Sequence, residues 1–294
     1  MMCEMNLTEG IIDLTLGEEE QPTRVVIPSS SGPNLMALMR ERLPLGFQLS
    51  SRQTQFLSQS TNWTCGYTNI LMLVSSFEGI PFFPALMGGI NNGLLTGVAD
   101  VMAMIELAWA DGYDEVGCRL LSPLSSGKWI GATEVVTVLR YMGARSMVVD
   151  FTSENCTSHT GGLACICAQW LNKYFSQVWP SQEGIYVRGE RFIPPVYLQY
   201  VGHSVTIVGI HFDEAIPTNS RVLIFDPRMS MVDSYQNLQW PGALAPAMEK
   251  TAQRLFCKSS YQIVYVSPDP LLEDERDHWK IVAAQPHEVI INLP

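Results

Sequence analysis

The sequence has no cluster of basic residues and no long uncharged apolar run. Its 18 Lys and Arg residues are scattered and stand against 29 Asp and Glu residues, for a formal net charge of −11. A groove that binds nucleic acid needs a concentrated positive surface. The most apolar stretch, residues 80–110, contains Asp100 and Glu106, whereas a membrane-spanning helix needs about 20 largely apolar residues. We therefore expect no nucleic-acid partner and no membrane span.

An ordered cysteine pattern is also missing. The seven cysteines are an odd number at irregular spacing, and Met1 is not followed by the basic segment and apolar core of a signal peptide. Both observations favour free thiols in a reducing compartment, namely the cytoplasm, the nucleus or both. The tightest candidate metal cluster, Cys156, His159, Cys165 and Cys167, fits none of the usual zinc spacings. We expect no metal, no cofactor and a monomeric protein.

The chain divides into a short acidic tail and one large domain. Residues 1–24 carry six acidic side chains against a single Arg, and a Ser-rich break follows at 29–33. Such a segment has too little apolar content to fold alone. From residue 33 onward no Pro/Ser-rich gap, charge block or repeat interrupts the pattern. We predict a flexible tail over 1–32 and a single domain over 33–294.

Helical patterns come first and strand patterns later. Apolar residues at helical spacing predict helices at 70–77, 98–110, 133–143 and 163–179. Runs rich in β-branched and aromatic residues predict strands at 146–151, 205–212, 221–225 and 261–266. This order favours an α+β fold over a strictly alternating α/β one.

Cys65 precedes the first helical pattern and lies on the first turn of that predicted helix. Unpaired amide groups and the positive end of the helix dipole favour a thiolate there. A free cysteine is also commonly a buried structural thiol. The catalytic interpretation is favoured only if the sequence also provides a candidate base for Cys65.

Among the five histidines, only His203 stands at the mouth of a predicted strand. The next predicted strand ends at Asp226, and in an antiparallel hairpin the start of the first strand lies beside the end of the second. Asp226 would then orient the imidazole and stabilise its charged form. His203 lies 138 residues after Cys65. This order and spacing are those of papain-like cysteine peptidases.

Five segments carry a more specific resemblance. Residues 62–73, Asn-Trp-Thr-Cys-Gly-Tyr-Thr-Asn-Ile-Leu-Met-Leu, resemble the nucleophile segment of the zinc-finger-containing ubiquitin peptidases, which are relatives of the ubiquitin-fold-modifier peptidases. Residues 197–209 and 223–227 resemble the histidine and aspartate segments of that family. Residues 108–114 and 129–135 resemble segments whose acidic residues hold arginines in the modifier's C-terminal tail. Together these segments cover most of residues 50–230.

The resemblance implies a papain-like fold, with the nucleophile helix packed on an antiparallel sheet. It also implies a deubiquitinating peptidase that cleaves the isopeptide bond after the C-terminal Gly-Gly of ubiquitin, in polyubiquitin chains. Cys65 would attack the carbonyl, His203 would transfer the proton and Asp226 would orient His203. Gln199, with the Cys65 amide, would hold the oxyanion.

The same resemblance implies a substrate site built from acidic and aromatic side chains. Asp114 and Glu134 would pair with the tail arginines, because charge-assisted bonds between arginine and carboxylate provide register as well as affinity. Trp63 belongs to the nucleophile segment and Trp129 to the segment of Glu134, and both are expected beside the substrate.

Two alternatives stay open. Arg228 follows Asp226 and Pro227, where the modifier-peptidase branch has a histidine, and this difference favours the ubiquitin branch. The substrate could still be another ubiquitin-like modifier, or the chain could be a non-catalytic adaptor that binds a modifier. An adaptor has no need of an intact Cys/His/Asp set, which speaks against that second alternative.

The acidic tail contains a candidate binding motif of its own. Ile11, Ile12 and Leu14 form a short β-prone run that precedes the acidic residues 18–20. This arrangement resembles a SUMO-interaction motif, in which an extended strand adds to the sheet edge of the modifier and acidic neighbours meet its basic rim. The same run could instead be an edge strand of this protein's own sheet.

Overall fold

The computed structural model describes residues 35–77, 95, 97–155, 162–176, 193–230 and 248–286. The tail residues Ile11, Ile12 and Leu14 lie outside this part, as do Cys156 and His159. The SUMO-interaction motif and the boundary at residue 32 therefore stay predictions. No helix in the described part combines the length and the apolar character that crossing a membrane requires.

The helices of the described residues are short to medium in length. They are α1 (Leu35–Arg42), α2 (Cys65–Ser75), α4 (Val98–Ala110), α5 (Glu115–Leu121), α6 (Ala132–Tyr141), α7 (Leu163–Ser176), α9 (Ala252–Leu255) and α10 (Arg276–Trp279). The predicted helix at 98–110 has the predicted bounds, and Gly143 after α6 has the predicted left-handed conformation, with φ 88°. The nucleophile helix begins at Cys65, five residues before the apolar pattern that predicted it.

The strands form one sheet. They are β1 (Phe47–Leu49), β2 (Ala144–Thr152), β3 (Val196–Tyr200), β4 (His203–His211), β5 (Arg221–Phe225), β6 (Glu249–Thr251), β7 (Ser260–Pro270) and β8 (Gln285–Pro286). Their order is β6-β5-β4-β3-β7-β2-β8, and β1 pairs with the far end of β4. Within the described residues every pairing is antiparallel except that of β2 with β8.

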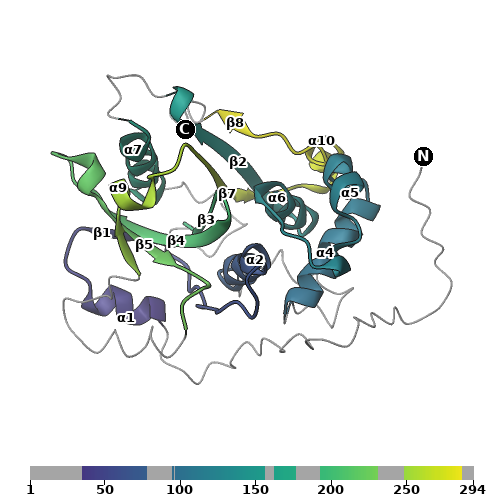
Figure 1. Ribbon diagram of the computed structural model, residues 1–294, viewed down its shortest axis with the longest axis horizontal. Helices are drawn as coiled ribbons and strands as arrows, with labels where there is room; N and C mark the ends of the chain where they lie inside the picture. Colours follow the sequence, from purple (N-terminus) through teal and green to yellow (C-terminus); the bar gives the residue numbers. More distant parts are fainter. Residues whose placement is uncertain are drawn as a thin grey trace.

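Helices cover both faces of this sheet, as Figure 1 shows. On β5, Leu223 and Phe225 join the core formed with α1, α2, α4 and α6, whereas Val222 and Ile224 join the core formed with α7 and α9. Successive strand residues point to opposite faces, so a strand buried on both sides is largely apolar. This explains why residues 222–225 of β5 form a continuous apolar run.

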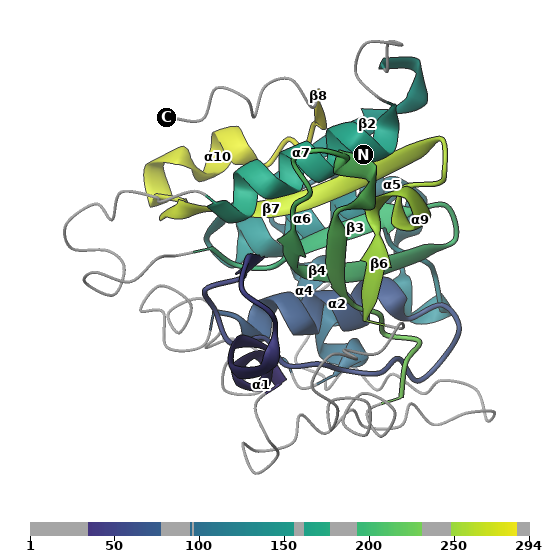
Figure 2. The ribbon, with the colours of Figure 1, turned by 90° about the vertical axis from the view of Figure 1, so that its left-hand side faces the viewer.

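Helix α2 lies against strand β4, which Figure 2 shows from the side. The contact is partly polar, because Asn69 of α2 bonds Ser204 and Thr206 of β4. The predicted α+β fold, with a nucleophile helix packed on an antiparallel sheet, is therefore confirmed. This is the papain-like arrangement.

Candidate active site

Cys65 is the first residue of α2 and is buried. The first four amide groups of a helix have no partner within it, and the preceding residue Thr64 makes no side-chain cap. The loop before α6 passes directly over this helix end, since a Cβ at Gly66 would lie 2.6 Å from Ile130 Cγ1. Only glycine allows this approach.

His203 is the first residue of β4, and Asp226 directly follows β5. The antiparallel pairing of β4 with β5 sets Thr206 opposite Phe225, and this register brings His203 Nε2 to 2.7 Å from Asp226 Oδ1. The Arg228 amide donates to the same carboxylate oxygen at 2.9 Å. The hairpin thus places the two residues together as its local geometry predicts.

The second imidazole nitrogen, Nδ1, is available to interact with the Cys65 thiol. His203 Nδ1 is buried and has no regular hydrogen-bond partner among the described residues. The sulfur of Cys65 nevertheless lies close enough to His203 for the two groups to perturb each other's pKa. Catalytic hydrogen bonds are often long in the absence of substrate. Nδ1 is therefore the atom that can accept the thiol proton.

The pKa shifts favour an ion pair. Burial by itself would raise the pKa of Cys65, but interactions with His203 and Ser204 outweigh it and lower that pKa. Burial would lower the pKa of His203, but the bond to Asp226 and the interaction with Cys65 raise it. Burial would also raise the pKa of Asp226, which the His203 interaction lowers instead. These directions stabilise a thiolate next to an imidazolium.

Gln199 lies on β3, beside the start of β4. Its Nε2 donates to the carbonyls of Tyr200 at 3.1 Å and His203 at 3.3 Å, and its Oε1 accepts from the Tyr197 hydroxyl. The amide donor is thus engaged by main-chain carbonyls in this arrangement. Its role at the oxyanion site stays a prediction.

Asn69, one turn after Cys65, is a site residue that the sequence patterns did not reveal. Its Nδ2 donates to the Cys65 carbonyl at 2.8 Å and to Ser204 Oγ at 3.0 Å. Its Oδ1 accepts from Thr206 Oγ1 at 2.7 Å. Because Ser204 adjoins His203 in sequence, these bonds fix the helix of the nucleophile to the strand of the base. An asparagine among apolar helix residues is the signal that could have pointed to it.

Asp114 and Glu134 come together over Gly117. Each carboxylate uses one oxygen at the start of its own helix: Asp114 Oδ1 accepts from the Gly117 amide at 3.1 Å, and Glu134 Oε2 accepts from the Gly131 amide at 2.7 Å. A Cβ at Gly117 would lie 2.0 Å from Asp114 Oδ2 and 3.2 Å from Glu134 Oε1. The remaining two oxygens therefore flank one point above Gly117.

This acidic pair has no cation of its own. Both side chains are buried, and no ion pair joins either of them to a cationic side chain of the described residues. Asp114 Oδ2 has no regular hydrogen-bond partner there, and an interaction with the Trp109 side chain only partly offsets the effect of burial on the pKa of Asp114. Burial raises the pKa of both carboxyl groups, and the charge of Asp114 adds to the rise at Glu134. A guanidinium group from another molecule would relieve this repulsion.

Glu134 lies near the start of α2. Ile130 packs on Gly66, the residue after Cys65, and the amide of the next residue, Gly131, donates to Glu134. The loop that holds Glu134 therefore contacts the helix that begins at Cys65.

Two tryptophans border the same region. Trp63 is half-buried, contacts Tyr67 edge to face at 5.6 Å between ring centroids, and lies over Gly127. Trp129 is 47% exposed, next to Ile130. Trp63 is therefore held in place by packing, and Trp129 offers an exposed aromatic surface.

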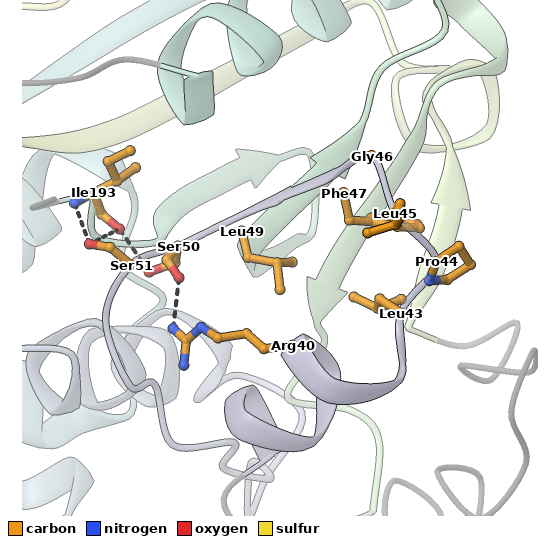
Figure 3. A pocket seen from close by; sticks show the side chains of 10 residues that line it. All are labelled: Arg40, Leu43, Pro44, Leu45, Gly46, Phe47, Leu49, Ser50, Ser51 and Ile193. Atoms are coloured by element: carbon orange, nitrogen blue, oxygen red, sulfur yellow. Dashed lines mark hydrogen bonds between the residues drawn. The ribbon is translucent and has the colours of Figure 1, made fainter.

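A separate pocket of about 310 Å³ lies between α1 and β1, and Figure 3 shows its lining. Arg40 Nη2 donates to the Ser50 carbonyl at 2.9 Å, and Ser50 Oγ donates to the Ile193 carbonyl at 2.8 Å. Strand β1 pairs with residues 209–211 of β4, at the opposite end of that strand from His203. The pocket is therefore not part of the catalytic centre.

No group of three or more His, Cys, Asp or Glu side chains arranged to hold a metal ion occurs among the described residues. Cys65, Cys165 and Cys257 are free thiols.

The chain is similar to several known proteins. The zinc finger-containing ubiquitin peptidase 1 of Rattus norvegicus is 32% identical over 167 residues, which cover 56% of this chain and 27% of that protein. The ubiquitin carboxyl-terminal hydrolase mug105 of Schizosaccharomyces pombe is 27% identical over 179 residues, covering 60% of this chain and 62% of that protein. The crystal structure of UfSP from C. elegans aligns with a TM-score of 0.48 and 16% identity, over 78% of this chain and 35% of that one.

A sequence profile of the family described as peptidase family C78 matches residues 46–264. This range contains Cys65, His203 and Asp226, as well as Asp114 and Glu134, and it amounts to well over half of the chain. The chain therefore belongs to peptidase family C78.

Proposed function

We propose that this chain is a cysteine-type deubiquitinase that hydrolyses the isopeptide bond after the C-terminal Gly-Gly of ubiquitin, in polyubiquitin chains. The observation that carries the proposal is the buried pair Asp114 and Glu134, which forms no ion pair with a cationic side chain of the described residues and whose loop before α6 packs against the start of the Cys65 helix. A cationic modifier tail is the substrate that such a pair fits. The ubiquitin peptidases among the relatives agree with this choice.

In the proposed first half-reaction, His203 Nδ1 takes the proton of Cys65, and the sulfur attacks the carbonyl carbon of the terminal glycine. The oxyanion forms beside the amide groups at the start of α2. When it collapses, the C–N bond breaks, and His203 returns the proton to the leaving lysine amine. Asp226 keeps Nε2–H pointing away from the sulfur and stabilises the charged ring.

In the second half-reaction, water attacks the thioester while His203 takes one of its protons. The C–S bond breaks, the free carboxylate of ubiquitin leaves and the Cys65 thiol is restored. If Gln199 contributes to the oxyanion site, its Nε2 has to exchange the two main-chain carbonyls for the developing charge, since those carbonyls hold it in the free protein.

An electrophilic probe at the C-terminus of ubiquitin tests the proposal directly. Wild-type protein should form a covalent adduct, and Cys65→Ala should form none. The same probe chemistry on other ubiquitin-like modifiers identifies the preferred one. A preference for another modifier would overturn the choice of ubiquitin, and no adduct with any modifier would favour the adaptor.

The acidic pair is tested through substrate affinity. Asp114→Asn keeps an N-cap residue that tolerates the left-handed conformation, so it removes the charge with little other change. We expect a raised KM and a nearly unchanged kcat, because the lost contact is present in ground state and transition state alike. Glu115→Gln is the matched control, since Glu115 is the next residue and its ion pair with Arg119 is exposed. A pure kcat defect in Asp114→Asn would contradict the tail contact.

The pH dependence should follow from the raised pKa values of both carboxyl groups. A protonated carboxyl cannot form the charge-assisted bond, so KM should rise as the pH falls through these raised values. In Asp114→Asn this rise should be smaller. Steady-state kinetics between pH 5 and 8 would show it, and a KM independent of pH would contradict the role of the pair.

A further inference from the structure

A segment after β7 contacts the turn that carries Asp114, and it lies outside the range of the family match. We define the C-terminal strap as residues 271–282, which follow β7 and include α10. The match to peptidase family C78 ends at residue 264. The Leu271 amide donates to the Gly143 carbonyl at 2.9 Å, which starts the strap at the end of α6. Figure 1 shows α10 near α6, and a hydrogen bond from Arg140 to the Trp279 carbonyl joins the two helices.

Arg140 fastens the strap to α6. This side chain is only 4% exposed and lies on the helix that carries Glu134. Its Nη1 donates to the carbonyls of Trp279 at 3.0 Å and Ile281 at 2.9 Å, and its Nε donates to the Ser146 carbonyl at 3.0 Å. Burial lowers the pKa of Arg140 to about 10, so the group is still charged at neutral pH. A buried charge needs such acceptors.

The ring of Trp279 strengthens this attachment. The Arg140 guanidinium carbon lies 4.8 Å from the ring centroid, and that of Arg145 lies 5.3 Å from it. Arg145 also pairs with Glu275 of the strap. Cation–π contacts of this kind add to the hydrogen bonds. The strap is thus held by two arginines from the end of α6 and the start of β2.

The strap in turn holds the residue that carries the proposed specificity. The Asp114 amide donates to the Lys280 carbonyl at 3.0 Å. Lys280 Nζ lies 3.8 Å from Asp111 Oδ2 and 5.7 Å from the centroid of the Tyr113 ring. These contacts bind the strap to three of the four residues of the 111–114 turn.

Asp114 needs such support because of its backbone conformation. It is the single non-glycine residue with positive φ among the described residues, at φ 43° and ψ 63°. This conformation is unfavourable for residues with a Cβ and persists only where the surroundings enforce it. This backbone conformation directs the Asp114 carboxylate toward Gly117 and Glu134. The carbonyl that accepts the hydrogen bond of the Asp114 amide belongs to the strap.

We propose that the C-terminal strap is a specificity-determining element, which Arg140 positions and which holds Asp114 ready for the cationic tail of the modifier. This inference rests on the proposed function. The bonds of the strap described above reach Asp114 but none of Cys65, His203 and Asp226. Loosening the strap should therefore weaken substrate binding and leave the chemical step intact.

Trp279→Ala tests the strap from its partly exposed side, where loss of folding is least expected. Arg140→Lys keeps the charge but loses the planar fork that reaches two carbonyls. Asp274→Ala, on an exposed turn of the strap, is the matched control. For ubiquitin with a fluorogenic C-terminal group, we expect KM to rise about tenfold in both variants, with kcat within about twofold of wild type. Hydrogen exchange at the Asp114 amide should accelerate, because its acceptor moves away.

Two results would overturn the proposal. One is unchanged exchange at the Asp114 amide in Trp279→Ala and Arg140→Lys. The other is an unchanged KM in both variants while Asp114→Asn raises it. An unchanged KM in Asp114→Asn itself would overturn the tail contact and the strap proposal together. A Cys65-dependent adduct with the ubiquitin probe would show that the peptidase function survives that result.

Discussion

Gly117→Ala should separate the packing of the acidic pair from ordinary helix stability. Gly117 lies inside α5, where glycine normally costs about 0.5–1 kcal/mol relative to alanine. A surface glycine would therefore gain stability on this substitution. Here the new Cβ would lie 2.0 Å from Asp114 Oδ2, 2.9 Å from Asp114 Cγ and 3.2 Å from Glu134 Oε1. All three distances are shorter than ordinary van der Waals contacts, so the Asp114 side chain has to move.

The displacement of Asp114 has two calculable costs. Overpacking of a buried position costs about 1–3 kcal/mol, and the loss of an N-cap bond costs about 0.5–2 kcal/mol. Together they outweigh the helix-propensity gain. We expect the free energy of unfolding to fall by about 1–3 kcal/mol, which corresponds to a decrease in Tm of a few degrees for a chain of this size.

The functional readout should change in the same variant. A displaced Asp114 carboxylate no longer shares its position with Glu134, so KM for ubiquitin should rise while kcat changes little. Gly97→Ala is the control, because Gly97 has an extended backbone and its Cβ would meet no atom within 4 Å. Urea unfolding and steady-state kinetics measure both quantities. A Gly117→Ala protein that is as stable as wild type, with unchanged KM, would refute the packing argument.

Three further predictions concern the catalytic set and the tail. Asp226→Asn should reduce kcat by about a hundredfold or more and move the alkaline limb of kcat/KM to lower pH, because the Asp226 carboxylate raises the pKa of His203; an alkaline limb that stays in place would argue against this coupling. Asn69→Leu should lower the free energy of unfolding by about 1–3 kcal/mol, since it leaves buried partners unpaired, and should lower kcat more than it raises KM; a kcat equal to that of wild type would show that the strand holds the thiol without Asn69. Deletion of residues 1–31 should abolish SUMO binding of roughly micromolar affinity but leave diubiquitin cleavage near the wild-type rate; a truncated chain that unfolds or loses activity would assign the tail motif to the fold.

Some of the site was predictable because it depends on short-range rules. The pairing of His203 with Asp226 follows from the register of one hairpin, β4 and β5. The position of Cys65 at a helix start could likewise be read locally, although the helix begins earlier than its apolar pattern. Asn69, which links α2 to β4, is polar and buried. Its burial comes from contacts with a distant strand, and no periodicity in the sequence indicates such contacts.

Helix α5 shows where the patterns fail. It has seven residues, and its apolar side chains Val116 and Leu120 are 57% and 71% exposed. Without a buried apolar face it leaves no helical period in the sequence. Its start is determined instead by the Asp114 cap and by the Lys280 carbonyl, which comes from 166 residues further along the chain.

The sequence by itself determined the α+β class, the order of the candidate nucleophile, base and acid, and the residue types of the proposed substrate site. Those properties depend on periodicity, on hairpin geometry and on short motifs. Only the tertiary structure decided that Asp114 and Glu134 meet over Gly117, that Asn69 joins α2 to β4, and that the strap reaches Asp114. These contacts join residues from distant segments, and their geometry depends on how helices pack on the sheet rather than on any local preference.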